Sequence, residues 1–241
     1  MLVAKIVFTL KFGTLKFMCK KFLFIILSLS MFSCEIKPEK DFADVTETFI
    51  KEYAQLFPDE TPLRKSNENL SKMHIPTDKM MDSVKAFYAL SIAQIQNFKE
   101  AEMTPSVKKD FFKVKSILKN VDVYLRKYHT DPTVYNVLFS FDRVLNSDFT
   151  TPENRLQILF AKLENVPAFY AAAKSQLQSS DVKLADEAIE KHFQTYLFFD
   201  KTLPDFIKKN HHITPQYQAR LEAAKLAIKD YVAFVESLRL I

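Results

Sequence analysis

The chain has 241 residues, with one glycine, two cysteines and a formal net charge of +5. Phosphate-cradling loops, dinucleotide-binding turns and nucleophile elbows depend on glycine, so this composition excludes the enzyme classes built on them. The only glycine, Gly13, lies in a segment that we expect to be removed. Ten prolines punctuate the apolar runs, and the composition favours an all-helical protein.

The positive charge is confined to the front of the chain. Residues 1–33 hold five of the 34 basic residues and none of the 29 acidic ones, so residues 34–241 carry 29 of each. A nucleic-acid-binding protein needs a basic surface to contact phosphates. The charge distribution therefore argues against a nucleic-acid partner. Both cysteines, Cys19 and Cys34, also lie at the front, which excludes a disulfide framework in the folded body.

The front of the chain matches the pattern of a secretory signal peptide. Lys20 and Lys21 precede the 11-residue apolar run 22–32, which is followed by Ser33 and Cys34. Such a run is too short to span a bilayer and fits the hydrophobic region of a cleaved signal. We therefore expect residues 1–33 to be a signal peptide.

The start of the signal peptide favours a later initiation site than the first methionine. Met18 lies directly upstream of the charged residues of the signal, where a start codon is expected. We interpret residues 1–17 as an over-extended gene start.

The cysteine after the apolar run resembles the lipobox of bacterial lipoproteins, although Met31 and Phe32 depart from its usual leucine and small residue. The resemblance implies cleavage between Ser33 and Cys34 and attachment of a diacylglycerol to Cys34, so that residues 34–41 tether the protein to a membrane. The alternative is an ordinary cleaved signal beside a chance cysteine. We expect an exported, lipid-anchored protein of the bacterial envelope, with the outer membrane favoured over the inner.

Residues 42–241 predict a single all-α domain, a helical bundle of about seven helices. Apolar residues recur at steps of three and four along each expected helix, the pattern of a helix with one buried face. The polar, proline-containing residues 58–71 predict a loop. The expected helices span residues 41–57, 76–102, 104–129, 131–146, 150–178, 181–210 and 214–238.

Capping residues followed by proline mark several of the expected starts. A Thr or Asp can cap a helix, and a proline fits the first helical position, where no N–H is needed. Pro167 is expected to bend the helix 150–178 rather than end it, because the apolar stripe continues in phase beyond it. Pro204 is expected to bend or break the next helix. The proline-containing starts are Thr104-Pro105, Asp131-Pro132, Thr151-Pro152 and Thr214-Pro215, and Asp181 caps the sixth helix.

Some aromatic residues fall outside the regular stripes, which indicates either helices buried on two sides or a hydrophobic groove. Two-sided burial is favoured, because a chain of this size needs an inner helix. These residues are Phe112, Phe139, Phe160, Phe198 and Phe206.

The histidines do not form a zinc-peptidase motif, which needs two of them one turn apart together with a glutamate. None is followed by Glu, and none has another three or four residues away; they are His74, His129, His192, His211 and His212. The sequence predicts no metal site, no cofactor and no recognisable catalytic set.

His192 lies on an apolar stripe next to Tyr196, so these two are the candidates for a cavity between helices. The favoured alternative is a core histidine with a hydrogen-bond partner.

Several short segments occur in the order found in the N-terminal half of a bacterial family known as domain of unknown function eight-eight-five, which the chain resembles over roughly residues 45–240. They are Phe57-Pro58, Thr61-Pro62-Leu63, the run from Asp131 to Asn136, Arg155-Leu156, Leu163, Val166-Pro167-Ala168 and Asp230-Tyr231. Full-length members look like helical zinc metallopeptidases whose His-Glu zinc motif lies in their second half. The resemblance implies a helical fold, and it assigns no zinc-binding or catalytic role to any residue of this chain.

Two functions remain open. The first is a non-catalytic, envelope-anchored lipoprotein that binds a peptide, a polymer or a protein partner. The alternative is the N-terminal half of a split or truncated zinc metallopeptidase of the same family. An unaided acid–base enzyme built around His192 is a remote third.

Overall fold

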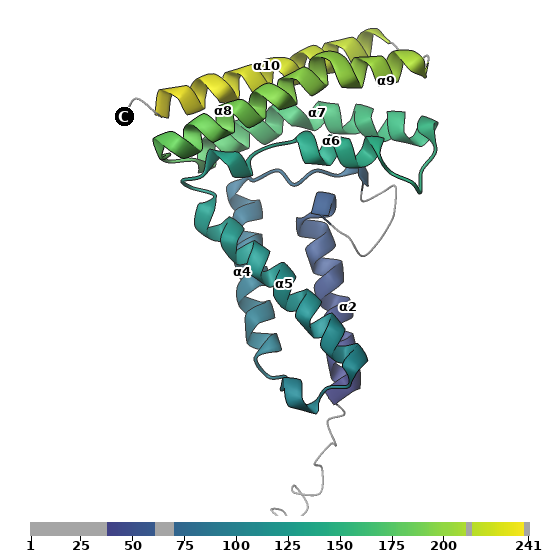
Figure 1. The fold of residues 1–241 in the computed structure, drawn as a ribbon, viewed down its shortest axis with the longest axis vertical. Coiled ribbons are helices and arrows are strands. Elements are labelled where there is room, and N and C mark those ends of the chain that lie inside the picture. Colours follow the sequence, from purple (N-terminus) through teal and green to yellow (C-terminus); the bar gives the residue numbers. More distant parts are fainter. Residues whose placement is uncertain (1–37, 61–69, 211–213, 239–241) are drawn as a thin grey trace, which may run out of the picture. The chain divides into compact units, whose positions relative to one another are not determined.

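The computed structural model describes residues 38–60, 70–210 and 214–238 of the protein, and these ranges contain helices, turns and connections but no strand (Figure 1). From Phe42 onward the described residues belong to one compact unit. The predicted all-α fold is confirmed. None of the described helices is both long and apolar enough to cross a membrane. Ser33, Cys34 and the His211-His212 pair lie outside the described residues.

The first three long helices are α2 (Pro38–Leu56), α4 (Asp78–Ile95) and α5 (Pro105–Lys127), with short 3-10 turns at Pro58–Glu60 and Glu100–Glu102. They share an aromatic core, in which Phe49 of α2 lies 5.1 Å from Phe87 of α4 between ring centroids. Tilted rings at this distance add attraction beyond the area that they bury. The buried residues of this core include Phe42, Phe111, Val114, Leu118 and Val121.

Helix α4 ends at Ile95, seven residues before its predicted end near Glu102. The chain turns at this point because Phe98 leaves the helix direction to pack edge-on against Phe42, with 5.1 Å between ring centroids. A ring contact with a distant helix therefore overrides the local helical pattern. The predicted start is right, since the Thr77 hydroxyl accepts the backbone N–H of Met80 as an N-cap.

The predicted helix 131–146 is wrong in its first half. The structure has a 3-10 turn, η3 (Pro132–Val134), then a non-helical connection, then the short helix α6 (Leu138–Leu145). The Tyr135 side chain is buried and donates a hydrogen bond of 2.5 Å to the Tyr128 carbonyl. Turning this ring back onto the end of α5 is incompatible with a continuous helix from Pro132.

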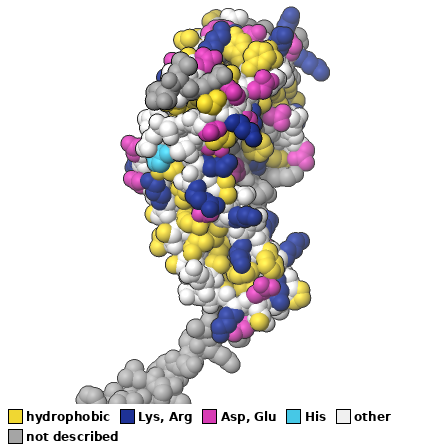
Figure 2. All heavy atoms as spheres, turned by 60° about the vertical axis from the view of Figure 1, so that its left-hand side comes forward, with side chains coloured by type: hydrophobic (Ala, Val, Ile, Leu, Met, Phe, Trp, Pro, Cys, Tyr) yellow, Lys and Arg dark blue, Asp and Glu magenta, His cyan; other side chains and the backbone are white. Residues whose placement is uncertain are grey.

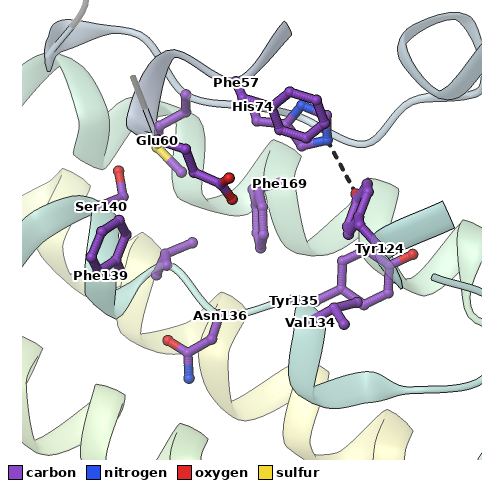
Figure 3. A pocket seen from close by; sticks show the side chains of 12 residues that line it. Phe57, Glu60, His74, Tyr124, Val134, Tyr135, Asn136, Phe139, Ser140 and Phe169 are labelled. Atoms are coloured by element: carbon purple, nitrogen blue, oxygen red, sulfur yellow. Dashed lines mark hydrogen bonds between the residues drawn. The ribbon is translucent and has the colours of Figure 1, made fainter. Parts of the chain in front are cut away.

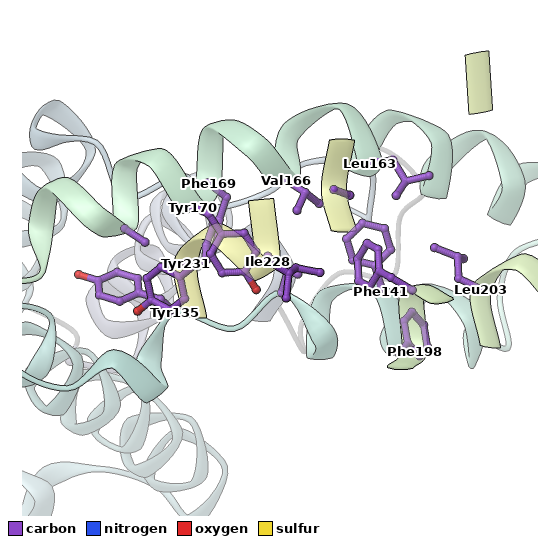
Figure 4. Packing of buried hydrophobic residues seen from close by; sticks show 14 of the residues in the cluster. Tyr135, Phe141, Leu163, Val166, Phe169, Tyr170, Phe198, Leu203, Ile228 and Tyr231 are labelled. Carbon is purple, nitrogen blue, oxygen red and sulfur yellow. The ribbon is translucent and has the colours of Figure 1, made fainter. Parts of the chain in front are cut away.

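The remaining helices are α7 (Pro152–Gln176), α8 (Val182–Leu197), α9 (Leu203–Lys209) and α10 (Pro215–Leu238). Helix α7 packs against α10 and α6, and α10 packs against α8. Figure 4 shows their shared core, where Tyr170 of α7 lies 5.0 Å from Tyr231 of α10 between ring centroids. Helix α7 buries residues around much of its circumference, as expected for an inner helix; these include Leu156, Ile158, Leu159, Lys162, Leu163, Val166 and Phe169.

Both internal prolines are accommodated without a break in the chain of helices. Pro167 lies inside α7, which continues to Gln176. Pro204 follows the π-helical turn Phe198–Thr202 and occupies the first turn of α9, where a missing N–H is tolerated. Counting α8, this turn and α9 as one run, the described residues contain seven helical runs.

Candidate functional site

The connection between α5 and α6 is held in place by its own side chains. Asp131 Oδ1 accepts hydrogen bonds from the backbone N–H and the hydroxyl of Thr133, at 2.9 and 2.6 Å. Its other oxygen accepts a bond of 3.0 Å from Lys127. Burial raises the pKa of the Asp131 carboxyl, but these bonds outweigh it and leave the pKa below its ordinary value. A charged Asp131 therefore fixes the 3-10 turn.

Helices α8 and α10 hold the same connection from the other side. His192 Nε2 lies 2.8 Å from the Tyr135 carbonyl oxygen, and the Thr195 hydroxyl donates to Asn136 Oδ1 at 3.0 Å. The Tyr231 hydroxyl donates to the Pro132 carbonyl at 3.1 Å. Contacts from two helices thus orient the residues from Pro132 to Asn136 toward the cavity described next.

An inner cavity of about 110 Å³ lies where this connection meets the ends of α2 and α5 (Figure 3). A volume of this size holds several water molecules or a small organic group. Six of its twelve lining side chains carry aromatic rings. The lining residues are Phe57, Glu60, Met73, His74, Tyr124, Val134, Tyr135, Asn136, Val137, Phe139, Ser140 and Phe169.

His74 is oriented by three contacts at this cavity. Its Nδ1 lies 2.6 Å from the Leu56 carbonyl oxygen, which only accepts, so Nδ1 carries the proton. In the neutral ring Nε2 then accepts a hydrogen bond of 3.1 Å from the Tyr124 hydroxyl. Phe57 stacks on the imidazole at 5.0 Å between ring centroids, with the planes 12° apart. These contacts define one tautomer and one ring position.

Glu60 brings a negative charge to the cavity. Its Oε2 accepts a hydrogen bond of 2.8 Å from the Tyr53 hydroxyl. Burial raises the pKa of Tyr124, and the charge of Glu60 raises it further. The pKa of Tyr53 is also raised, first by burial and then by the charge of Glu60. Both phenols therefore stay protonated and act as hydrogen-bond donors.

Ser140 connects the cavity wall to a buried lysine. Lys162 of α7 is fully buried, and its ammonium donates to Ser140 Oγ at 2.6 Å and to the Lys72 carbonyl at 2.8 Å. Buried lysines need such partners, because an unpaired charge inside a protein is costly. Lys162 therefore joins α7 to α6 and to the segment before α4.

A larger outer groove of about 910 Å³ adjoins the inner cavity and shares Glu60, Val134, Asn136 and Phe139 with it. Phe139 is 62% exposed, unusual for a phenylalanine. Apolar, amide and charged side chains of both signs line the groove. Its residues are Glu60, Thr133, Val134, Asn136, Leu138, Phe139, Asp142, Lys191, Gln194, Leu197, Phe198, Lys201 and Thr202.

The two residues predicted for a cavity lie elsewhere. His192 is 1% exposed and is enclosed by the rings of Tyr170 and Tyr231, at 5.6 and 4.8 Å between centroids. Tyr196 is half-buried beneath the ammonium of Lys229, 4.7 Å from its ring centroid. Neither side chain lines the inner cavity or the outer groove. His192 instead supports the cavity from behind, through the Tyr135 carbonyl.

Sequence reasoning missed His74, Tyr124 and Glu60 as site residues. They come from separate segments that only folding brings together. Two signals pointed toward the site without identifying it: Phe139 lay outside the regular stripes, and the run from Asp131 to Asn136 was among the segments quoted for the family resemblance. Within the described part of the chain, no three His, Cys, Asp or Glu side chains are grouped closely enough to hold a metal ion.

The face drawn in Figure 2 carries charges of both signs. On the face drawn in Figure 2, lysine and arginine side chains alternate with acidic ones and with hydrophobic side chains between them. Several acidic and basic residues pair, such as Lys191 with Glu187 at 2.7 Å. This face therefore offers no broad basic surface.

The fold and the cavity together define an all-α protein with a pocket suited to a small group, and comparison with known proteins adds one structural relative. No family model matches the chain, and no curated protein matches it. A solved structure from Shewanella oneidensis, a protein of unknown function considered a lipoprotein, is similar with a TM-score of 0.69 over 81% of this chain, at 21% identity. The chain covers 37% of the length of that protein. Such a similarity shows a shared fold.

Proposed function

We propose that the protein is a lipid-anchored protein of the bacterial envelope whose helical domain binds a peptide segment in the outer groove without altering it chemically. The groove itself is the observation that carries the proposal. Its volume of about 910 Å³ falls in the range usual for ligand sites, and it continues into a smaller inner cavity. The predicted signal peptide, the lipobox-like Cys34 and the fold shared with a protein considered a lipoprotein support the anchor.

The lining of the outer groove suits a peptide better than a charged polymer. Leu138, Phe139 and Leu197 offer apolar surface, while Asn136 and Gln194 carry amides that can bond to a peptide backbone. The charged residues divide evenly between the acids Glu60 and Asp142 and the bases Lys191 and Lys201. An anionic polymer would require an excess of basic residues.

The test is binding of a random heptapeptide pool to the full-length protein purified in detergent, with enriched sequences identified by mass spectrometry and titrated by calorimetry. Phe139→Ala should lower the affinity for the enriched peptides about tenfold or more, because a few aromatic side chains usually contribute most of the binding energy. Phe112→Ala is the matched control, since Phe112 is 48% exposed but lies on α5, away from the groove. If no peptide is enriched, or both variants lose affinity equally, the proposal fails.

A second candidate is the N-terminal half of a zinc metallopeptidase whose catalytic half is encoded separately. The favouring observations are the family resemblance and the greater length of the Shewanella protein, of which this chain covers 37%. Sequencing the DNA downstream decides between the two candidates. A reading frame with His-Glu-x-x-His or a related motif supports the peptidase, and unrelated sequence supports the binding protein. Peptide hydrolysis by the purified chain with added zinc would also contradict the first proposal.

A further inference from the structure

We propose that the inner cavity binds an organic ammonium group, held by the Glu60 carboxylate within a ring of aromatic side chains. Only the natural source of this ammonium group rests on the proposed function. A peptide in the outer groove would place its terminal amine or a lysine side chain in the cavity.

Aromatic rings are the main component of the cavity wall. Besides His74, five phenylalanine and tyrosine rings contribute, from the end of α2, from α5, from the connection before α6, from α6 and from α7; they are Phe57, Tyr124, Tyr135, Phe139 and Phe169. The face of such a ring carries negative potential and attracts a cation within about 6 Å of its centroid. Several rings around one small space form the arrangement that recognises alkylammonium groups.

The hydroxyls of the two tyrosines are already occupied. Tyr135 donates to the Tyr128 carbonyl, and Tyr124 is bonded to His74 and lies 3.6 Å from Met81 Sδ. A ligand in the cavity therefore meets mainly ring surface from these residues. That surface suits the weakly hydrated methyl and methylene groups next to an ammonium nitrogen.

Glu60 supplies the counter-charge. Glu60 is the acidic side chain among the described lining residues. Figure 3 shows its carboxylate pointing into the space between Ser140, Phe139 and Phe169. Tyr53 donates to one carboxylate oxygen, and within the described residues Glu60 forms no ion pair. A carboxylate that lines a space walled by rings, and that has no ion pair among the described residues, favours a cationic ligand over a neutral or anionic one.

Two protein cations lie near the cavity without lining it. Lys162 stands behind Ser140, and its ammonium is bonded to Ser140 Oγ and the Lys72 carbonyl. The charge of Arg143 lowers the pKa of Tyr53, the partner of Glu60. Their repulsion opposes an ammonium ligand, whereas the charge of Glu60, which lines the space itself, attracts it.

The size of the cavity limits the ligand to a compact head. About 110 Å³ accommodates a methylated or primary ammonium with a few carbons, while the shared residues Val134, Asn136 and Phe139 leave a path for the rest of the ligand toward the groove. The expected ligand is therefore an alkylammonium head on an extended tail.

The experiment compares charged probes with uncharged partners of the same shape, using the full-length protein in detergent and ligand-observed NMR titration. Choline is paired with 3,3-dimethyl-1-butanol, alanyl-alanine amide with its N-acetyl form, and Nα-acetyl-lysine methylamide with its Nε-acetyl form. At least one charged probe should bind about tenfold more tightly than its partner, equivalent to about 1.4 kcal/mol. The pair with the largest preference identifies the source of the ammonium group as a quaternary headgroup, a peptide amine or a lysine side chain. If no charged probe is preferred, the inference is overturned.

Three variants tie the preference to the cavity. Glu60→Gln keeps an acceptor for Tyr53 and should remove the charge preference, lowering affinity for the charged probe about tenfold. Glu52→Gln makes the same substitution on the exposed side of α2, outside both the inner cavity and the outer groove, and should leave affinity within about twofold. Phe139→Leu alters a largely exposed ring, so folding should survive, and affinity should fall severalfold. Equal behaviour of the Glu60 and Glu52 variants, or binding unchanged by Phe139→Leu, would contradict the assignment.

The inference and the proposed function can fail independently. Free and N-acetylated peptides that bind equally well would leave peptide binding intact and refute an ammonium site. Choline that binds with Glu60-dependent affinity, while no peptide is enriched, would support the ammonium site and refute the peptide proposal.

Discussion

At the scale of single residues, His192 shows how the core and the candidate site depend on each other. Its ring nitrogens lie 2.7 Å from the Ala188 carbonyl oxygen and 2.8 Å from that of Tyr135. A neutral imidazole has one N–H and can donate to only one of them, whereas the protonated ring could donate to both. Burial nevertheless lowers the pKa of His192, against the effect of the two carbonyls. The folded protein therefore favours the neutral ring.

This shift predicts a loss of stability in mild acid. Because the folded-state pKa lies below the ordinary value of 6.5, the unfolded chain takes up the proton first as the pH falls. As the pH falls below 6.5, the free energy of unfolding should decrease. This group contributes at most about 1.4 kcal/mol of that decrease per pH unit. Urea unfolding at several pH values from about 8 to 5 measures it.

His192→Gln is the comparison for that measurement, because it removes the titrating group and keeps a hydrogen-bonding side chain. The variant should show a flatter pH dependence between 6.5 and 5 than the wild type. The pKa of Asp131 is lowered from its ordinary value of 3.8, so its contribution to the free energy of unfolding is lost only as the pH falls below about that value. The effects of the two groups are therefore separable. Parallel curves for wild type and variant would rule out the assignment to His192.

At the scale of elements, helix α7 combines the strongest start signal with an internal proline. Thr151 accepts the backbone N–H of Asn154 as an N-cap, and Pro152 occupies the first helical turn. Pro167 lies well inside the same helix and cannot donate to the carbonyl four residues earlier. The helix persists because its buried residues, from Leu156 to Ala173, contact α6 and α10. Tertiary packing here overcomes a local penalty.

The two prolines of α7 give a matched pair of substitutions. Pro167→Ala should raise the free energy of unfolding by about 1–2 kcal/mol. An interior proline costs up to about 3 kcal/mol relative to alanine, but proline also restricts the unfolded chain, and the alanine variant loses that stabilising effect. Pro152→Ala should change it by less than about 0.5 kcal/mol, because the first turn needs no N–H. Denaturant unfolding of both variants measures the difference. A Pro167→Ala protein that is less stable than the wild type would show that the packing of α7 requires the proline.

At the scale of the whole molecule, the lipid anchor proposed at Cys34 predicts where the protein is found. In cells grown with labelled palmitate, the wild type should be labelled and recovered with membranes. Cys34→Ala should be unlabelled, because it removes the thiol that the thioether needs. Cys19→Ala should behave as the wild type, since Cys19 precedes the apolar run. Labelling that survives in Cys34→Ala would place the lipid elsewhere or exclude it.

Much of the helical fold could be predicted from the sequence, and little of the candidate site. Helices α2, α5, α7 and α10 were predicted within a few residues, because each has a long apolar stripe. The stop of α4 and the break at Tyr135 were not, since Phe98 and Tyr135 leave their helices to make contacts across the fold. The apolar stripe around His192 indicated a buried residue, and His192 is 1% exposed. Such a stripe indicates burial and does not show which residues line a cavity.

The sequence by itself determined the helical class and most helix starts, because caps, prolines and apolar periodicity act over a few residues. The exported, lipid-anchored front end stays a prediction from the sequence. Only the tertiary structure decided that Phe57, Glu60, His74, Tyr124 and Phe139 surround one cavity. Apart from Phe57 and Glu60, these residues are far apart along the chain, and their meeting depends on how helices pack and on the connection held by Asp131, His192 and Tyr231. No local pattern carries that information.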